Sequence, residues 1–141
     1  MFTDLSVGFL WDWQPLNYEF SGFFPPIANA PTINKIKAGQ AVPVQFSLNG
    51  FKGMGILATG YPQTQMVACG SGAPLSAGTP TVTAGNSGLQ YDPTSDTYTY
   101  VWKTDRSMPV GSCQQLVVKF AFAQFYPGFT GATYIANFNV R

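Results

Sequence analysis

Apolar and polar residues alternate along most of this chain, and a period of two predicts β-strands rather than helices. The clearest run covers residues 42–48, where four apolar side chains share one face: Val42, Val44, Phe46 and Leu48. Pro43 stands between them on the other face and has no N–H for a ladder hydrogen bond. We therefore expect this strand to lie at the edge of a sheet, or to begin at Pro43.

Further strands are expected at spacings of roughly ten residues, which is typical of an all-β sandwich. They cover residues 54–59, 65–69, 79–84, 87–91, 97–102, 116–122 and 133–140. Gly85-Asn86 lies between two of these strands and predicts a hairpin turn. The pattern predicts an all-β fold: an antiparallel two-sheet β-sandwich, Ig-like in architecture. The spacing of Cys69, Trp102 and Cys113 is not that of an immunoglobulin domain, so the topology stays open.

Three of the later strands each have one strongly apolar face, and these faces are the expected core. The residues on them are Tyr98, Tyr100 and Trp102 in the first, Leu116, Val118, Phe120 and Phe122 in the second, and Tyr134, Ala136, Phe138 and Val140 in the third. The intervening positions are mostly polar, as expected for strands that bury one side only.

Residues 1–17 form a separate segment in front of a domain that covers residues 18–141. Large apolar side chains occupy every odd position from 5 to 13: Leu5, Val7, Phe9, Trp11 and Trp13. This alternation predicts an extra N-terminal strand with one strongly hydrophobic face, which buries a large area when it is covered. Two interpretations stay open. The strand folds back into its own sandwich, or it acts as a donor strand at the open edge of a neighbouring copy.

A second aromatic segment, residues 122–129, places four rings around Pro127-Gly128: Phe122, Phe125, Tyr126 and Phe129. A loop this apolar is not expected to face water. It is interpreted as a lid or extended strands of the sandwich, as a contact between subunits, or as a platform on which sugars stack. Phe125, Tyr126 and Phe129 therefore join Leu5–Trp13 as candidate interface residues.

Composition narrows the class of protein. The chain has 141 residues, enough for one domain with its own core. Charged residues make up 9%, against roughly 25% in an average soluble domain, which is typical of a secreted or partner-covered surface. The net charge is +1 and the basic residues are scattered, so no nucleic-acid partner is expected. No apolar run is long enough to span a bilayer.

The N-terminus lacks the features of a signal peptide. Residues 1–17 contain Asp4 and Asp12, have no Lys or Arg, and end without a small-residue cleavage site. If the natural protein is secreted, we expect that its leader has been removed or lies upstream of this sequence.

The two cysteines, Cys69 and Cys113, have two interpretations: one disulfide, or two unrelated buried thiols. A disulfide here would close a loop of about 45 residues and contribute about 4 kcal/mol of stability in the chain-entropy model. The secreted character of the composition favours the disulfide.

Little in the sequence points to chemistry. There is no histidine, and no serine stands in a G-x-S-x-G elbow that would activate it. We expect no catalytic residues, no cofactor and no metal, and therefore a non-enzymatic protein. Asp92 and Asp96 lie in an oxygen-rich turn that suits either Ca²⁺ or Asx-type hydrogen bonds, and the second interpretation is favoured.

Several short motifs occur in order along the domain: YEFSGFF (18–24), NAPTIN (29–34), KAG (37–39), AVPVQFSL (41–48), YDP (91–93), YTYVWKTD (98–105), CQQLVVK (113–119) and ANF (136–138). With these motifs the chain resembles the PxKF-domain family of bacterial secreted proteins. The resemblance implies a C-terminal module of a large extracellular protein, without catalytic residues, whose two family cysteines map onto Cys69 and Cys113. The chain departs from the family at Gln45, which replaces the lysine of the family's name, at residues 122–129 and in the N-terminal segment.

These observations favour a non-catalytic structural or interaction subunit located outside the cell or at the cell surface. The expected partner is the chain itself, in a homo-oligomer, filament or surface layer that forms by β-strand addition of the N-terminal segment. The alternative is a ligand- or carbohydrate-binding accessory module of a larger secreted protein.

Overall fold

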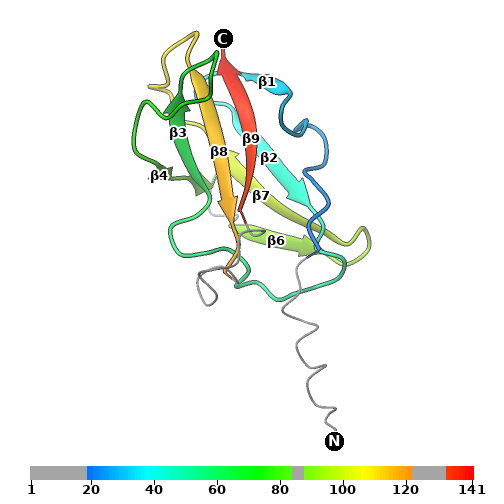
Figure 1. The fold of residues 1–141 in the computed structure, drawn as a ribbon. Coiled ribbons are helices and arrows are strands. Elements are labelled where there is room, and N and C mark those ends of the chain that lie inside the picture. Colours follow the sequence, from blue (N-terminus) through cyan, green and yellow to red (C-terminus); the bar gives the residue numbers. More distant parts are fainter. Residues whose placement is uncertain (1–18, 84–87, 122–132) are drawn as a thin grey trace, which may run out of the picture.

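A computed structural model describes residues 19–83, 88–121 and 133–141, and within these ranges the chain forms nine strands and no helix (Figure 1). None of the described residues belongs to a helix that could cross a membrane. The strands are β1 (Ile33–Ile36), β2 (Ala41–Phe46), β3 (Gln63–Val67), β4 (Thr79–Pro80), β5 (Val82–Thr83), β6 (Leu89–Asp92), β7 (Thr97–Lys103), β8 (Cys113–Lys119) and β9 (Thr133–Val140).

The strands form two sheets that pack face to face, so the fold is the expected all-β sandwich. The larger sheet has the order β1-β9-β8-β3-β4. The smaller sheet has the order β2-β7-β5, and β6 also pairs with β7. β2 is therefore an edge strand, as its proline predicted.

One strand pair departs from the expected antiparallel arrangement. β1 and β9 run parallel, with Ile33 opposite Asn137 and Ile36 opposite Val140, whereas the other paired strands are antiparallel. The reason is that the chain crosses from the larger to the smaller sheet between β1 and β2. β1 therefore cannot form a hairpin with β2, and it lies instead beside the last strand of the chain.

The apolar faces expected from the sequence form the core between the sheets. The residues of these faces that are buried are Val42, Val44, Phe46, Leu48, Tyr98, Trp102, Leu116, Val118, Phe120, Ala136, Phe138 and Val140. Trp102 of the smaller sheet meets Phe138 of the larger sheet edge to face, with ring centroids 5.3 Å apart. Such aromatic contacts add to the large apolar burial that holds the two sheets together.

The predicted hairpin at Gly85-Asn86 is wrong. Val82 of β5 lies opposite Lys103, and Leu89 of β6 lies opposite Tyr100, so both short strands follow the same edge of β7 in the same direction. A hairpin would require the two strands to pair with each other. The Gly-Asn turn signal is local, whereas the pairing is decided by the long edge of β7; residues 84–87 themselves lie outside the described residues.

The predicted strand at residues 54–59 is also wrong, because this segment contributes only an isolated bridge between Leu57 and Phe120. Gly53 and Gly55 surround its beginning, and glycine weakens a strand. Ile56 and Ala58 are nevertheless buried. The segment thus covers part of the core without becoming a regular strand.

Residues 19–24 run antiparallel along the outer edge of β2. Phe23 forms a bridge with Phe46, and the Phe24 N–H donates to the Gln45 carbonyl over 2.8 Å. The Glu19 N–H reaches the Leu48 carbonyl at 3.4 Å. The candidate interface residues that precede this stretch (Leu5, Val7, Phe9, Trp11 and Trp13) and those of the second aromatic segment (Phe125, Tyr126 and Phe129) lie outside the described residues, and their roles stay predictions.

Candidate functional site

The loop of residues 47–55, which follows β2, is the candidate functional site. It lies at the lower end of the sandwich in Figure 1, where β2 and β8 end. Its backbone turns sharply: Asn49 has φ 61°, Gly50 φ 111° and Gly53 φ 90°. These left-handed conformations suit glycine and, less well, asparagine, which explains the local sequence.

Asp96 ties the start of this 47–55 loop to the smaller sheet. Its carboxylate accepts hydrogen bonds from the Ser47 hydroxyl (2.8 Å), the Gly50 N–H (3.2 Å) and the Tyr91 hydroxyl (2.7 Å). Bonds to an ionised acceptor are stronger than neutral ones. Residues 47 and 50 come from one part of the chain and residues 91 and 96 from another, so the network fixes the loop through long-range contacts.

The same network changes the acidity of its members. The hydrogen bond from Tyr91, then those from Ser47 and Gly50, hold the pKa of Asp96 below its usual value. In return the hydrogen bond to Asp96, with some desolvation, raises the pKa of Tyr91 to about 12. Asp96 is therefore a carboxylate and Tyr91 a neutral donor over the whole physiological range.

Tyr98 holds the middle of the loop from the side of the core. Its ring is completely buried, and its hydroxyl accepts the Lys52 N–H at 2.7 Å and donates to the Gly53 carbonyl at 2.8 Å. The backbone on both sides of this point thus has defined partners. The loop is built into the fold even though it contains little regular structure.

This anchored backbone presents apolar side chains to solvent. Phe51 is 57% exposed and Met54 is 47% exposed. The ring of Phe51 rests on Tyr91 at a centroid distance of 4.9 Å and stacks at 6.3 Å on Tyr98, so one side of it is supported and the other is open. Among the described residues, Phe51 has the most exposed aromatic ring. Such an arrangement can bind an apolar partner with little loss of loop freedom.

The turn between β6 and β7 serves the structure. Asp92 accepts the Thr94 N–H at 2.9 Å, which is the Asx-type bond favoured by the sequence, and Asp96 is occupied by the loop. Within the described ranges no three His, Cys, Asp or Glu side chains come close enough to hold a metal ion.

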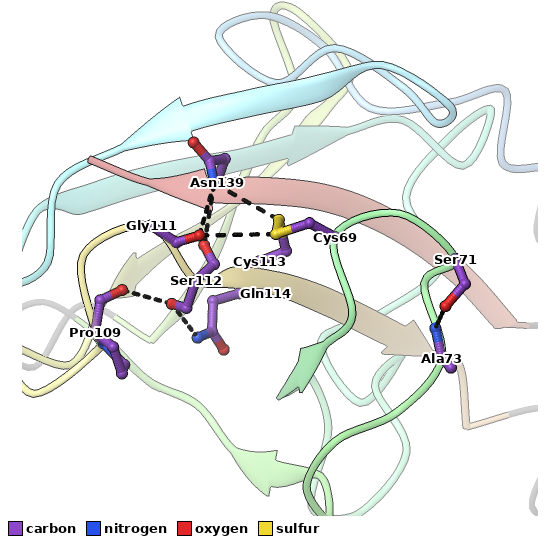
Figure 2. Close-up of a disulfide and its surroundings, with 9 residues drawn as sticks. All are labelled: Cys69, Ser71, Ala73, Pro109, Gly111, Ser112, Cys113, Gln114 and Asn139. Atoms are coloured by element: carbon purple, nitrogen blue, oxygen red, sulfur yellow. Dashed lines mark hydrogen bonds between the residues drawn. A yellow bond between two sulfur atoms is a disulfide. The ribbon is translucent and has the colours of Figure 1, made fainter.

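The two cysteines form the expected disulfide at the opposite end of the sandwich (Figure 2). Cys69, just after β3, joins Cys113, the first residue of β8, across a Cα–Cα distance of 5.2 Å. The side-chain amide of Asn139 donates to the carbonyls of Gly111 and Ser112, at 3.3 Å each, and so fastens the loop before β8. The disulfide therefore links β3 and β8, which are neighbouring strands of the larger sheet.

The sequence indicated the disulfide but missed the 47–55 loop as a site. The signal was present, because Phe51 and Met54 each stand between glycines, where a solvent-exposed turn is expected. It was hidden by the expected strand at residues 54–59. The partners of the loop, Tyr91, Asp96 and Tyr98, are distant in sequence and carry no local signal.

No protein-family model matches the chain, and no curated protein is significantly similar to it. The class that the structure defines is thus a two-sheet β-sandwich with one disulfide. The resemblance to the PxKF-domain family stays a prediction.

Proposed function

We propose that this domain is a non-catalytic extracellular interaction subunit whose partner is another copy of itself. The observation that carries the proposal is the 47–55 loop, which holds Phe51 and Met54 exposed on a backbone fixed by Asp96 and Tyr98. An aromatic ring and a thioether exposed together on a fixed loop suit a surface that a partner covers.

The strand order of the two sheets supports an Ig-like arrangement as part of this proposal. In immunoglobulin-type sandwiches, strands B, E and D share one sheet, and C, F and G share the other. In the proposed arrangement β2, β7 and β5 correspond to B, E and D, and β3, β8 and β9 correspond to C, F and G. The disulfide differs, because it joins strands of one sheet rather than the two sheets. We propose membership of the PxKF-domain family on the same basis, with the motifs given above.

The extracellular location is supported by the disulfide and by the low charge. Disulfides persist in oxidising compartments and are rare in the cytosol. Only 9% of the residues of the whole chain are charged, so the surface relies on hydroxyl and amide groups for its contact with water. Both features suit a secreted or surface-bound domain.

Assembly is proposed to use the N-terminal segment as a donor strand. Residues 19–24 already lie along β2. Followed from residue 24 back to residue 19, they run toward the end of the sandwich that carries the 47–55 loop. The apolar residues Leu5–Trp13 would add to a strand edge of the next copy, and the residues around Tyr126 would extend the contact. Repetition of this contact from copy to copy builds a filament or a surface layer.

Negative-stain electron microscopy of the wild-type protein and of a variant lacking residues 1–14 tests this proposal. We expect filaments or regular assemblies for the wild type and single particles for the deletion. Trp11→Ser with Trp13→Ser should act like the deletion. Asp12→Ser, on the predicted opposite face of the same strand, should leave assembly intact. Single compact particles in every sample would contradict self-assembly.

A further inference from the structure

A groove lies between β3 and β4 of the larger sheet and β5 and β7 of the smaller sheet. Its volume is about 700 Å³, which is within the usual range for small-molecule sites. Inner-face residues of both sheets line it, together with the loop that follows β7. The groove shares no residue with the 47–55 loop.

The most informative residue of the groove is Gln114, because it is a polar side chain on an apolar face. Strand alternation places it with Leu116 and Val118, and it is 5% exposed. Its Nε2 donates to the Ser112 hydroxyl at 3.0 Å. Ser112 in turn donates its own hydrogen to the Pro109 carbonyl at 2.6 Å, so it can only accept from Gln114. This chain of bonds fixes which end of the Gln114 amide is the oxygen (Figure 2).

The Oε1 atom of Gln114 consequently points away from Ser112, and it accepts no hydrogen bond from the residues that the structure describes. A buried amide oxygen without a donor is costly, at about 1–3 kcal/mol. Buried polar groups of folded proteins nearly always have a partner. An apolar residue, as at the next two inner positions of β8, would avoid this cost. Gln114 lines this groove and also a smaller pocket beside the disulfide, and a hydrogen-bond donor bound in the groove can satisfy its Oε1.

Other lining groups define the chemistry of that donor. Thr64 and Thr79 face each other across β3 and β4, and their hydroxyls form no hydrogen bond within the described part of the chain. Arg106 lines the groove and forms no ion pair with any described residue. Met66 and Met108 add apolar surface. Asp105 is already occupied by the N–H and hydroxyl of Ser107, both at 2.8 Å.

We infer that this groove binds a neutral saccharide, one of whose hydroxyl groups donates to Oε1 of Gln114. A sugar supplies hydroxyls that both donate and accept, which suits the amide and the two threonines. It also supplies C–H faces for the methionines. The inference is independent of the proposed self-assembly, because the groove and the 47–55 loop are separate surfaces.

Titration of ¹⁵N-labelled protein with cellobiose, maltose and N,N′-diacetylchitobiose, each to about 20 mM, tests the inference in the affinity range expected of such a site. At least one of the three should shift the side-chain amide of Gln114 and the backbone amides of Thr64 and Thr79. Gln114→Met keeps the volume and should weaken that binding roughly tenfold or more. Its thermal stability should equal or exceed that of the wild type, because an unsatisfied polar group has been removed.

Gln115→Met is the matched control, because Gln115 is the next residue of β8 and faces outward, with its amide bonded to Asn137. It should bind the same sugar as the wild type does. Thr64→Val provides a second variant, with several-fold weaker binding expected. The inference is wrong if none of the three sugars shifts the groove resonances, or if Gln114→Met and Thr64→Val both bind with wild-type affinity.

Discussion

The two ends of the sandwich are held by different kinds of interaction. At the end where β8 begins, the Cys69–Cys113 disulfide joins β3 to β8 covalently. At the end where β8 finishes, hydrogen bonds to Asp96 and Tyr98 hold the 47–55 loop. The first end is fixed whatever the pH and exposes no thiol, whereas the second depends on the ionisation of a carboxylate and presents an aromatic ring. We therefore propose that stability and recognition belong to opposite ends of the sandwich.

The largest effect is expected at the disulfide end. Replacing both cysteines (Cys69→Ala with Cys113→Ala) removes a cross-link between residues 44 positions apart. The unfolded chain then gains loop entropy, and the free energy of unfolding should fall by about 4 kcal/mol. Urea unfolding followed by tryptophan fluorescence measures this change. A loss below about 1 kcal/mol would show that the disulfide contributes little to the stability of the domain.

At the loop end, Tyr98→Phe should have the next largest effect. The ring stays in the core, but the Lys52 N–H and the Gly53 carbonyl both lose their partner. We expect a loss of about 1–3 kcal/mol of unfolding free energy and faster hydrogen exchange at Lys52. Tyr100→Phe, in the same strand, is the control. Unchanged exchange at Lys52 would mean that the hydroxyl does not anchor the loop.

The ionisation of Asp96 gives the loop end a pH dependence that the disulfide end lacks. Because the pKa of Asp96 is lowered in the folded protein, its contribution is present above the unfolded pKa of about 4 and is lost as the pH falls through the folded value. Asp96→Asn should therefore lower the melting temperature at pH 7 and make this loss at low pH shallower. Asp92→Asn keeps a side-chain oxygen that can accept the Thr94 N–H, and it should change both less. Equal acid sensitivity of wild type and Asp96→Asn would contradict this role.

Tyr91 makes the stability of the same network depend on pH in the alkaline range as well. Its pKa is raised to about 12, so its contribution is present below the ordinary tyrosine pKa of about 10 and is lost as the pH rises toward 12. Tyr91→Phe should remove from the alkaline titration curve a tyrosine whose pKa is raised to about 12. Absorbance at alkaline pH measures this, and an unchanged titration curve would show that Tyr91 does not donate to Asp96.

The smallest effect on stability is expected at the tip of the loop. Phe51 contacts Tyr91 and Tyr98 on one side only, so Phe51→Ser should cost less than about 1 kcal/mol. Thermal unfolding checks this. A larger loss would mean that Phe51 belongs to the core of its own domain, and its exposure could then no longer be attributed to a partner.

Local alternation predicted the parts of the fold in which a strand buries one face. The inward residues of β2, β7, β8 and β9 follow a period of two, and their burial is what the core requires. The direction of β1 and the shared edge of β7 were not predictable in this way, because they depend on which distant strand offers an unpaired edge. Turn signals such as Gly85-Asn86 report local backbone preference and not the partner.

The candidate site was less predictable than the fold. The secreted character of the composition favoured a disulfide between Cys69 and Cys113 over two separate thiols. The loop network joins Ser47 and Gly50 to Asp96, positions that are 49 and 46 residues apart. Its hydrogen bonds exist only after the sheets have formed. From the sequence alone Asp96 was a turn residue like Asp92, and nothing distinguished the two.

The measurement that tests the central claim most directly is the molar mass of the wild type and of Phe51→Ser with Met54→Ser, by light scattering at micromolar concentration. Val110→Ser is the matched control, because Val110 is 79% exposed and lies in the loop that leads to β8, at the disulfide end. We predict assemblies for the wild type and the control, and a monomer for the double variant. A double variant that assembles like the wild type would contradict the assignment of recognition to the 47–55 loop.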